Sequence, residues 1–344
     1  DRKLKFGTFC SNLSGGCAIS KIDGVLKARW PETLEIAQLA EAMDLEALVP
    51  VGRWKGFGGP TNFNGEGFES FSWASAIAAS TENAGVFATT HVPTIHPIFA
   101  AKMGTTIDHV SNGRFALNIA QLAHEDRYKM AAEWLDVVKR LWTEDKEFDF
   151  EGQFYQIKAG WCAPKPLHKP YPPIMNAGGS EVGRHYAAKH CDVAFVVFTT
   201  HDKDEMRKQV AAYRDLARQE YGRELKIWGY AYVVQGETEK EARDFYNYYV
   251  HEQGDWEAAT NLLDTMGLNA QTLPKEAYAW IKEHFIAGWG GYPIVGTKEQ
   301  VVDKLQLLSD IGLDGTLLSW ARYAEGMREF QEKTYPLVVQ AGLR

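Results

Sequence analysis

The feature of this sequence that most constrains its fold is a repeated alternation of short β-branched runs with longer amphipathic patterns. Such alternation is typical of βα units that build a parallel sheet. Periodicity alone does not exclude an open doubly wound sheet, but eight units is the number that closes a barrel, and no GxGxxG fingerprint follows the first strand. We therefore predict an α/β fold, a (β/α)₈ TIM barrel. The eight predicted strands are Lys5–Cys10, Ala47–Val51, Ala84–Thr90, Arg114–Ile119, Pro173–Ala177, Val193–Phe198, Leu225–Val234 and Thr316–Trp320.

Helical patterns fill most of the connections, and two segments depart from simple alternation. Residues 148–157, with Gly152 near their middle, predict a hairpin. A helical block near residues 255–286, inside a helical stretch that begins at Glu237, is too long for one crossover. We expect both to be insertions in a single domain that spans residues 1–344. The other predicted helices are Pro31–Met43, Phe68–Ser80, Pro97–Val110, Asp126–Thr143, Ser180–His190, Lys203–Tyr221, Thr297–Ile311 and Gly326–Gln340.

Charge, hydropathy and cysteine spacing exclude several classes of protein. The net charge of −8 argues against nucleic acid or an anionic membrane as a partner. No apolar run approaches the roughly 20 residues that span a bilayer, and the first residues read directly into a strand rather than a signal peptide. Cys10, Cys17, Cys162 and Cys191 lack CxxC spacing, so we expect reduced thiols in a cytoplasmic protein. We expect no metal site, because the chain has no HExxH and no HxH after the first strand.

The turn Gly178-Gly179-Ser180 is the clearest local indication of a ligand. Barrels of this type bind ligands at the carboxyl ends of their strands, and this turn follows the fifth strand and opens a helix. Free N–H groups at a helix N-terminus suit a phosphate, although a plain turn with an N-cap serine has the same residues. Arg127 and Tyr128, at the start of another helix, carry groups that bind phosphate oxygens; the alternative is a solvated first turn.

The other strand ends offer fewer options for chemistry. There is no GxSxG elbow, and no strand-end lysine stands out as a Schiff-base former. His91 directly follows the third strand, where it is either a proton-transferring group in the pocket or a surface or packing residue. Arg53 either contacts a sulfonate or carboxylate or pairs with a surface acid. The hard chemistry therefore points to a bound cofactor. Four aromatic residues suggest either a pocket wall or core packing: Trp54, Phe57, Trp289 and Trp320.

A series of short segments runs in a recognisable order along nearly the whole chain. The segments are Asn12-Leu13-Ser14-Gly15-Gly16, Ser20-Lys21-Ile22, Gly56-Phe57-Gly58-Gly59, Glu69-Ser70-Phe71, Ala101-Lys102, Ile107-Asp108-His109, Ser111-Asn112-Gly113-Arg114, Asn118, Asp126-Arg127-Tyr128, Gly178-Gly179-Ser180 and Ile294-Val295-Gly296-Thr297. Each is weak alone. In this order the chain resembles the bacterial luciferase-like, flavin-dependent monooxygenases, in the branch that holds dimethyl sulfone, alkanesulfonate and pyrimidine monooxygenases.

The resemblance implies a two-component enzyme. A separate NAD(P)H:flavin reductase would supply reduced FMN, which reacts with O₂ to a flavin peroxide that oxygenates a small sulfone, sulfonate, N-heterocycle or aromatic compound. Whether the peroxide forms at C4a or N5 stays open. The residues it assigns to FMN are Val51, Gly52 and Asn118 beside the ring, and Arg127, Tyr128, Gly178, Gly179 and Ser180 at the phosphate.

The same resemblance implies catalytic and assembly roles. Residues 89–91 would face the flavin, which makes Thr90, His91 and Asn118 the candidate catalytic residues. The substrate pocket candidates are Arg53, Trp54, Phe57 and Trp320. Members are usually homodimers or homotetramers, packed partly through helices that correspond to Phe68–Ser80 and Pro97–Val110.

One connection departs from the family pattern. Only Ile119–Asp126 lies between Asn118 and Arg127, where members carry a long mobile loop over the substrate. The loop is either lost here or missing from the sequence, and we favour the second interpretation. Two other functions remain open: an F420-dependent hydride-transferring oxidoreductase on the same fold, and a flavin-binding protein without turnover.

Overall fold

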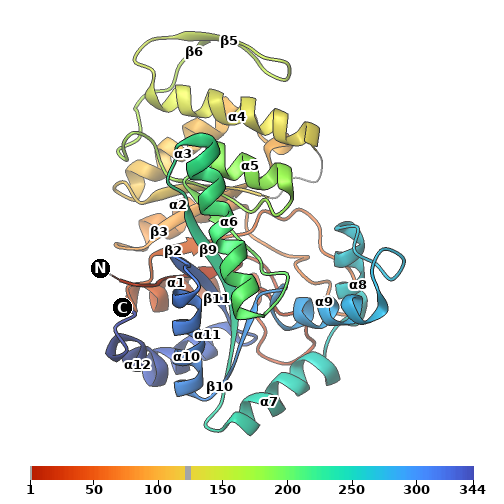
Figure 1. Ribbon diagram of the computed structural model, residues 1–344. Coiled ribbons are helices and arrows are strands. Elements are labelled where there is room, and N and C mark those ends of the chain that lie inside the picture. The colour runs from red at the N-terminus through yellow and green to blue at the C-terminus, as the bar shows by residue number, and fades with distance from the viewer. Residues whose placement is uncertain (1, 121–124) are drawn as a thin grey trace.

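Eight parallel strands close into a ring at the centre of the molecule (Figure 1). The computed structural model describes residues 2–120 and 125–344. The ring closes where the sixth strand pairs with the seventh, Val193 beside Lys226, which confirms the barrel and excludes the open sheet. Its strands, in order round the ring, are β1 (Lys5–Phe9), β2 (Ala47–Val49), β3 (Gly85–Thr90), β4 (Phe115–Ile119), β7 (Ile174–Asn176), β8 (Val193–Phe195), β9 (Lys226–Gln235) and β11 (Gly315–Ser319).

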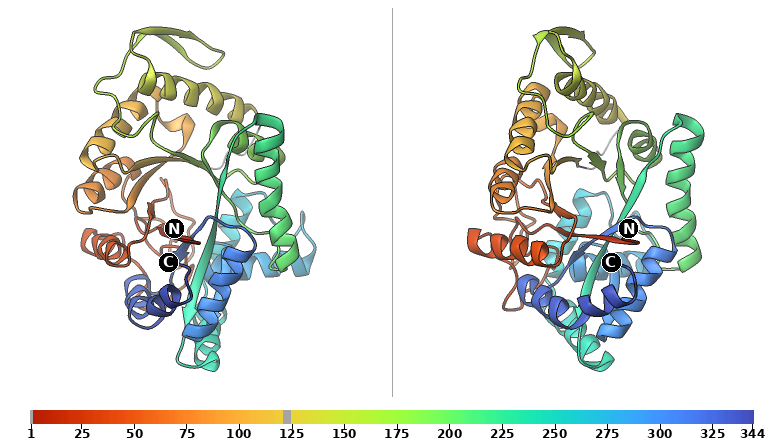
Figure 2. Two further views of the ribbon diagram at one scale, coloured as in Figure 1. Left: turned by 60° about the vertical axis from the view of Figure 1, so that its left-hand side comes forward. Right: turned by 90° about the vertical axis from the view of Figure 1, so that its left-hand side faces the viewer.

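Helices lie outside the strands, as the two views of Figure 2 show. Each predicted helix is present within a few residues of its expected bounds. Among the described residues, no helix combines the length and the apolar character that crossing a bilayer requires. The surrounding helices are α1 (Trp30–Ala42), α2 (Ser70–Ala79), α3 (Pro97–Val110), α4 (Glu125–Thr143), α5 (Glu181–His190), α6 (Lys203–Tyr221), α10 (Lys298–Asp310), α11 (Tyr323–Glu329) and α12 (Tyr335–Gln340).

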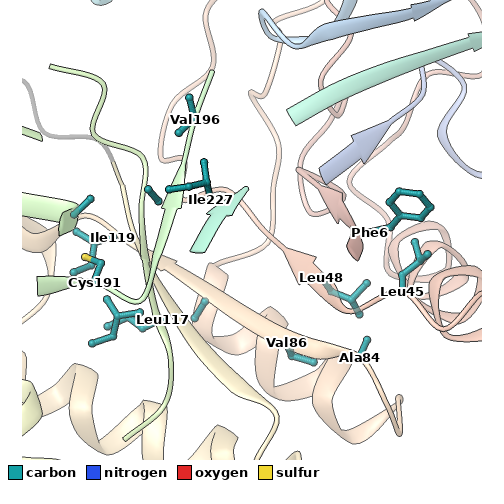
Figure 3. Packing of buried hydrophobic residues seen from close by; sticks show 14 of the residues in the cluster. Phe6, Leu45, Leu48, Ala84, Val86, Leu117, Ile119, Cys191, Val196 and Ile227 are labelled. Carbon is teal, nitrogen blue, oxygen red and sulfur yellow. The ribbon is translucent and has the colours of Figure 1, made fainter. Parts of the chain in front are cut away.

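The strands are buried on both faces because successive side chains point alternately into the barrel and out toward the helices. Phe6, Leu48 and Val86 belong to the large outer cluster shown in Figure 3, whereas their chain neighbours Val49 and Phe87 belong to the interior cluster. The interior is therefore a packed core rather than a channel. It leaves the carboxyl ends of the strands as the place for a ligand.

A ninth strand, β10 (Tyr292–Gly296), was not predicted. It pairs in parallel with Ala231–Gln235 of β9, whereas β8 pairs only with Lys226–Trp228. The far half of β9 would otherwise present unpaired N–H and C=O groups. Because β10 contains Pro293 and follows two glycines, its local sequence favours a loop, and only the exposed edge of β9 makes it a strand.

Both predicted insertions are present. The hairpin consists of β5 (Phe148–Glu151) and β6 (Gln156–Gly160), and so runs a few residues beyond the predicted end. The helical insertion is broken rather than continuous: α7 (Glu239–Asn247) runs into a π-helical turn and is followed by α8 (Trp256–Thr265) and α9 (Lys275–Gly288). A separate apolar cluster holds α8 and α9 against β9 and the loops that follow β1 and β2.

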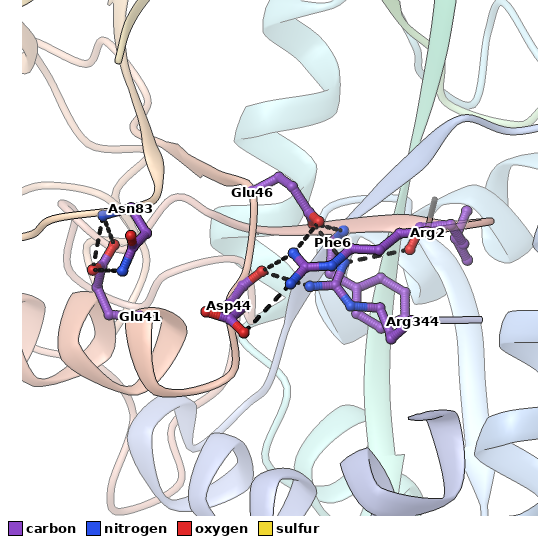
Figure 4. Close-up of polar contacts among 8 residues, drawn as sticks. Arg2, Phe6, Glu41, Asp44, Glu46, Asn83 and Arg344 are labelled. Atoms are coloured by element: carbon purple, nitrogen blue, oxygen red, sulfur yellow. Dashed lines mark hydrogen bonds and ion pairs between the residues drawn. The ribbon is translucent and has the colours of Figure 1, made fainter. Parts of the chain in front are cut away.

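At the end of the barrel where strands begin, carboxylates tie neighbouring strands together. Glu46, Asp192 and Asp314 each directly precede a strand. Each accepts the backbone N–H of a residue on the adjacent strand, at 2.8, 2.9 and 2.7 Å respectively. Figure 4 shows Glu46 between the guanidinium groups of Arg2 and Arg344. Acidic residues at this end therefore serve strand register and stability.

Candidate active site

A pocket of about 780 Å³ opens at the carboxyl ends of the strands. Its walls come from the loop after β2, the connection after β3, the first turn of α4 and one face of α8. Four polypeptide segments that are far apart in the chain therefore meet here. The lining residues are Gly52, Arg53, Trp54, Lys55, Gly56, Phe57, Gly58, His91, Pro93, Thr94, Arg127, Asn261 and Thr265.

The helical insertion is fixed to the loop after β2 by buried polar contacts. Asp255, the N-cap of α8, accepts hydrogen bonds from the backbone N–H and the hydroxyl of Thr61, at 2.8 and 2.6 Å. Asn261 donates to the carbonyl oxygen of Phe57 at 2.7 Å. These contacts hold α8 as a wall of the pocket, which limits the access of water. No local sequence signal indicated them.

Arg53 stands out among the lining residues because it is largely buried and has no acidic partner. None of its N–H groups donates a hydrogen bond within the described residues. Its guanidinium carbon lies 4.6 Å from the ring centre of Phe57 and 5.5 Å from that of Trp289. Burial lowers the pKa of Arg53, although the group stays protonated at neutral pH. Two aromatic rings thus hold a partly dehydrated cation at the pocket.

His91 lies in the pocket beside the end of β2. Its Nε2 is 2.9 Å from the carbonyl oxygen of Gly52, so the tautomer with Nε2–H donates there and leaves Nδ1 free to accept a proton. A side chain at Gly52 would come within 3.1 Å of the His91 ring, which explains the glycine. The predicted pair Gly52 and His91 is therefore a contact in the structure.

Asn118 is buried at the end of β4 and belongs to a short polar chain. Its Nδ2 donates to the Thr89 hydroxyl at 3.0 Å, and that hydroxyl donates to the carbonyl of Pro50 at 2.5 Å. Its Oδ1 is buried and has no partner among the described residues. Thr90 is buried and does not line the pocket. The orphaned Oδ1 fits an N–H donor on a ligand.

Val51 is positioned by a residue to which sequence reasoning assigned no role. Asn12, fully buried after β1, accepts from Val51 N and donates to Val51 O, both at 2.9 Å. It also donates to the carbonyl of Phe68 at 3.1 Å. One side chain therefore sets the backbone that leads into Gly52 and Arg53. The signal was its place at the head of the Asn12–Gly16 motif.

The predicted phosphate turn has the geometry of a helix cap. Ser180 is the N-cap of α5, as predicted, and its hydroxyl accepts from Gly183 N at 3.1 Å. A β-carbon on Gly183 would fall 2.6 Å from the hydroxyl oxygen of Tyr128, so α4 and α5 begin side by side. Gly179 has open space around it. The structure thus brings Tyr128 and Ser180 together at a helix N-terminus that suits a phosphate.

The remaining predicted residues lie in different surroundings. Trp54 is exposed and Phe57 buried, and both line the pocket. Trp320 does not line it; its ring packs against Tyr323 at 5.9 Å and Phe330 at 5.6 Å, outside the barrel. The predicted connection of residues 119–126 includes residues 121–124, which lie outside the described residues. Within the part of the chain that the structure describes, no cluster of metal-ligating side chains occurs.

Comparisons with known proteins agree in one direction. The sequence model of the luciferase-like monooxygenase family matches residues 4–315. The chain is 28% identical to the FMNH₂-dependent dimethylsulfone monooxygenase of Pseudomonas putida, over 97% of this chain and 95% of that protein. It is 25% identical to the pyrimidine monooxygenase of Acinetobacter baylyi, with the same coverage. The solved structure of a long-chain alkane monooxygenase has a TM-score of 0.85 at 21% identity, covers 99% of this chain and 92% of that one, and supports the fold.

Proposed function

Because the chain belongs to the luciferase-like monooxygenase family, we propose that it is a two-component, FMNH₂- and O₂-dependent monooxygenase that oxygenates a small organic molecule. One observation carries the proposal beyond family membership. The orphaned Oδ1 of Asn118, the α5 cap at Ser180 and the pocket beside Gly52 are all at the carboxyl ends of the strands. FMN has a part to match each of them: ring N–H groups, a phosphate and a face that a substrate approaches.

The cofactor's two ends would be held by different kinds of residue. Ser180, Gly178 and Gly179 offer hydroxyl and backbone N–H groups to the phosphate, with Tyr128 alongside and Arg127 reaching from the pocket rim. At the other end, Val51 and Gly52 would support the ring and Asn118 Oδ1 would accept one of its N–H groups. When bound, reduced FMN supplies the activation of O₂ and the oxygen atom that the substrate receives.

The chain's own residues would then control water and protons. The loop after β2 and the helix α8 exclude water from one side of the pocket. His91, held through Nε2, presents Nδ1 as the proton acceptor near neutral pH. Asn118 and Thr90 would orient the reacting groups, Asn118 through its link to Thr89.

Partners and location follow from this proposal. A separate NAD(P)H:flavin reductase would deliver the reduced cofactor, and both proteins would work in the cytoplasm. All four cysteines are buried and unpaired, which is compatible with a reducing compartment. We also propose a homodimer or homotetramer that uses α3, because Phe99 is 62% and Val110 47% exposed on its outer face. In α2, by contrast, Ala74 and Ala78 are buried against the barrel.

The test of the flavin site is a titration of FMN with matched variants. Ser180→Ala and Arg127→Ala should each weaken FMN binding by about tenfold, since a hydrogen bond to a charged group contributes about 1.5 kcal/mol or more. Thr297→Ala is the matched control because Thr297 caps α10 in the same way without facing the pocket. Unchanged FMN affinity in the first two variants would remove the phosphate assignment.

The test of the reaction uses ¹⁸O₂, FMN, NADH and a flavin reductase with a panel of sulfones, sulfonates and N-heterocycles. We expect one organic product to contain ¹⁸O by mass spectrometry, with sulfite released where a C–S bond is cleaved. FMN binding without labelled product from any class would favour a flavin-binding protein. Substrate-dependent hydride transfer to F420 would favour the alternative oxidoreductase.

A further inference from the structure

We propose that the substrate of this enzyme carries an anionic group, a carboxylate or a sulfonate, and that Arg53 is the residue that binds it. This inference rests on the proposed function, because it concerns the molecule that occupies the pocket beside the flavin. It goes further, since the function alone is equally compatible with a neutral substrate.

The first observation is the charge of the pocket. Its lining contains three cations, Arg53, Lys55 and Arg127, and none of the lining side chains that the structure describes is a carboxylate. The chain as a whole has a net charge of −8, so a positive pocket runs against the general composition. Such a local field attracts anions and raises their concentration at the site.

The second observation separates Arg53 from the other two cations. Arg127 and Lys55 are exposed at the rim, and the FMN phosphate accounts for Arg127. Arg53 is buried, and the Phe57 and Trp289 rings fix its position. A buried guanidinium without an acceptor is costly, and proteins ordinarily pair such a group. The cost is offset when a bound anion completes the site.

The third observation is that no group within the fold serves as the missing counter-ion. The thiol of Cys10 is the only titratable neighbour that raises the Arg53 pKa. Burial raises the pKa of Cys10 well above its usual value, so the thiol is neutral at physiological pH. Arg114 shows the contrast: it is partly buried too, but it donates to five protein acceptors, among them Ala78 O at 2.9 Å and Ala84 O at 2.6 Å.

The chemistry of the site narrows the anion to a class. A guanidinium offers a planar fork of N–H groups that binds carboxylate or sulfonate oxygens in pairs. Phe57 and Trp54 supply apolar surface beside it, which suits a compact organic body attached to the anion. Carboxylates and sulfonates share this recognition, and the experiment below distinguishes them.

The experiment compares shape-matched charged and neutral probes on the FMN-loaded protein by isothermal titration calorimetry. Benzenesulfonate is paired with methyl phenyl sulfone, and benzoate with benzamide. We expect at least one anion to bind about tenfold to a hundredfold more tightly than its neutral partner. Arg53→Met should abolish this preference, and Arg53→Lys should retain part of it. Lys55→Met, which removes an exposed cation from the same pocket, should change the preference by no more than about twofold. The preferred probe identifies the anion class.

The outcomes keep the inference separate from the proposed function. If the wild-type protein binds FMN but shows no preference for either anion, or if Arg53→Met keeps the preference, the inference is overturned and the proposed function stands. If Arg53→Met weakens FMN binding instead, Arg53 is a flavin contact and the inference fails. If FMN does not bind at all, the proposed function fails, and the same titrations on the protein without flavin still decide the anion site. Far-ultraviolet circular dichroism of each variant checks folding, and Arg53→Lys provides a conservative second variant.

Discussion

The two ends of the barrel treat charge in opposite ways. Where strands begin, Arg344 has a side chain that is only 1% exposed, and it pairs with Glu46 while donating to the carbonyl of Asp44. Where strands end, Arg53 is also buried but has aromatic rings and no acid beside it. Similar burial of the same side chain therefore comes with complete pairing at one end and none at the other.

The difference separates residues that stabilise the fold from residues that bind. The general motif Ser111–Arg114 illustrates the first kind, because Arg114 ties the end of α2 to the start of β3 and never reaches the pocket. Asn118 and Arg53 illustrate the second kind, with polar atoms that the protein leaves unpaired. In a barrel, conservation of stability and exposure of function are divided between opposite ends of the strands.

The largest effect is expected at the paired end. Glu46→Ala removes the acceptor of Phe6 N and leaves Arg344 buried without its carboxylate. We expect the free energy of unfolding to fall by about 3–5 kcal/mol, as for other broken buried pairs. Urea denaturation measures it. Glu325→Ala, which removes an exposed carboxylate 4.0 Å from Arg322, is the control and should change stability by less than about 0.5 kcal/mol. Equal effects of the two variants would contradict the division.

The polar chain behind the pocket should give the next largest effect. Thr89→Val keeps the side-chain shape but removes the hydroxyl that joins Asn118 to Pro50. Two buried groups lose their partner, so we expect a loss of about 2 kcal/mol in unfolding free energy. Thr106→Val is the control, because its exposed hydroxyl bonds only to the carbonyl of Lys102. A loss no greater than that of the control would show that the chain is unimportant for stability.

Arg53 offers the sharpest reversal of sign. Arg53→Met replaces an unpaired buried cation with a flexible apolar side chain that packs well against Phe57 and Trp289. We expect the unfolding free energy to rise by about 1 kcal/mol, a gain in stability at the expense of binding. The matched substitution Arg344→Met at the other end should lower it. Destabilisation by Arg53→Met would mean that the guanidinium contributes to the fold.

The smallest effect separates the ends by pH. Burial, helped by His284 and Lys304, lowers the pKa of His201 to about 4, from 6.5 in an unfolded chain. Between these values the unfolded state binds more protons, so stability contributed by neutral His201 is lost as the pH falls from about 6.5 to 4. His201 keeps partial contact with water, and we expect about 0.5–1 kcal/mol from it. His201→Gln should remove this part of the pH dependence in thermal melts.

The paired end should respond only at lower pH. Burial by itself would raise the pKa of Glu41, but the N–H groups of Ala84, Glu82 and Asn83 and the charge of Arg114 outweigh it and lower the pKa. Figure 4 shows Glu41 beside Asn83. Stability from Glu41 is therefore present above pH 4.5 and is lost below it. Loss of stability in a single step that His201→Gln leaves unchanged would contradict this order.

Much of the fold followed from local pattern. Alternating periods located all eight barrel strands, and Ser180 and Thr297 cap their helices as predicted. The strand β10 was missed because its residues favour a loop and the pairing that makes it a strand comes from β9, more than 50 residues away. The break between α8 and α9 was missed as well, since a helical pattern does not show where a helix turns back to pack.

The candidate site could be predicted only in outline. Tripeptides such as Gly178-Gly179-Ser180 carry their cap geometry with them, so the phosphate turn was visible from the sequence. Arg53 was one of several arginines with no distinguishing neighbour in the chain. Its missing partner depends on Trp289 and Phe57 converging from separate segments. Trp320, equally close to a strand end in sequence, faces α11 instead.

The sequence by itself therefore determined the barrel, its number of strands, its helix caps and the family, because these depend on periodicity and on turn chemistry over a few residues. Tertiary structure alone decided which charges were paired, which helix closed the pocket and which polar atoms stayed free. The physical reason is that pairing and desolvation depend on groups brought together across the whole chain. The opposite treatment of Arg344 and Arg53, two arginines with nothing in their local sequence to distinguish them, is the clearest case.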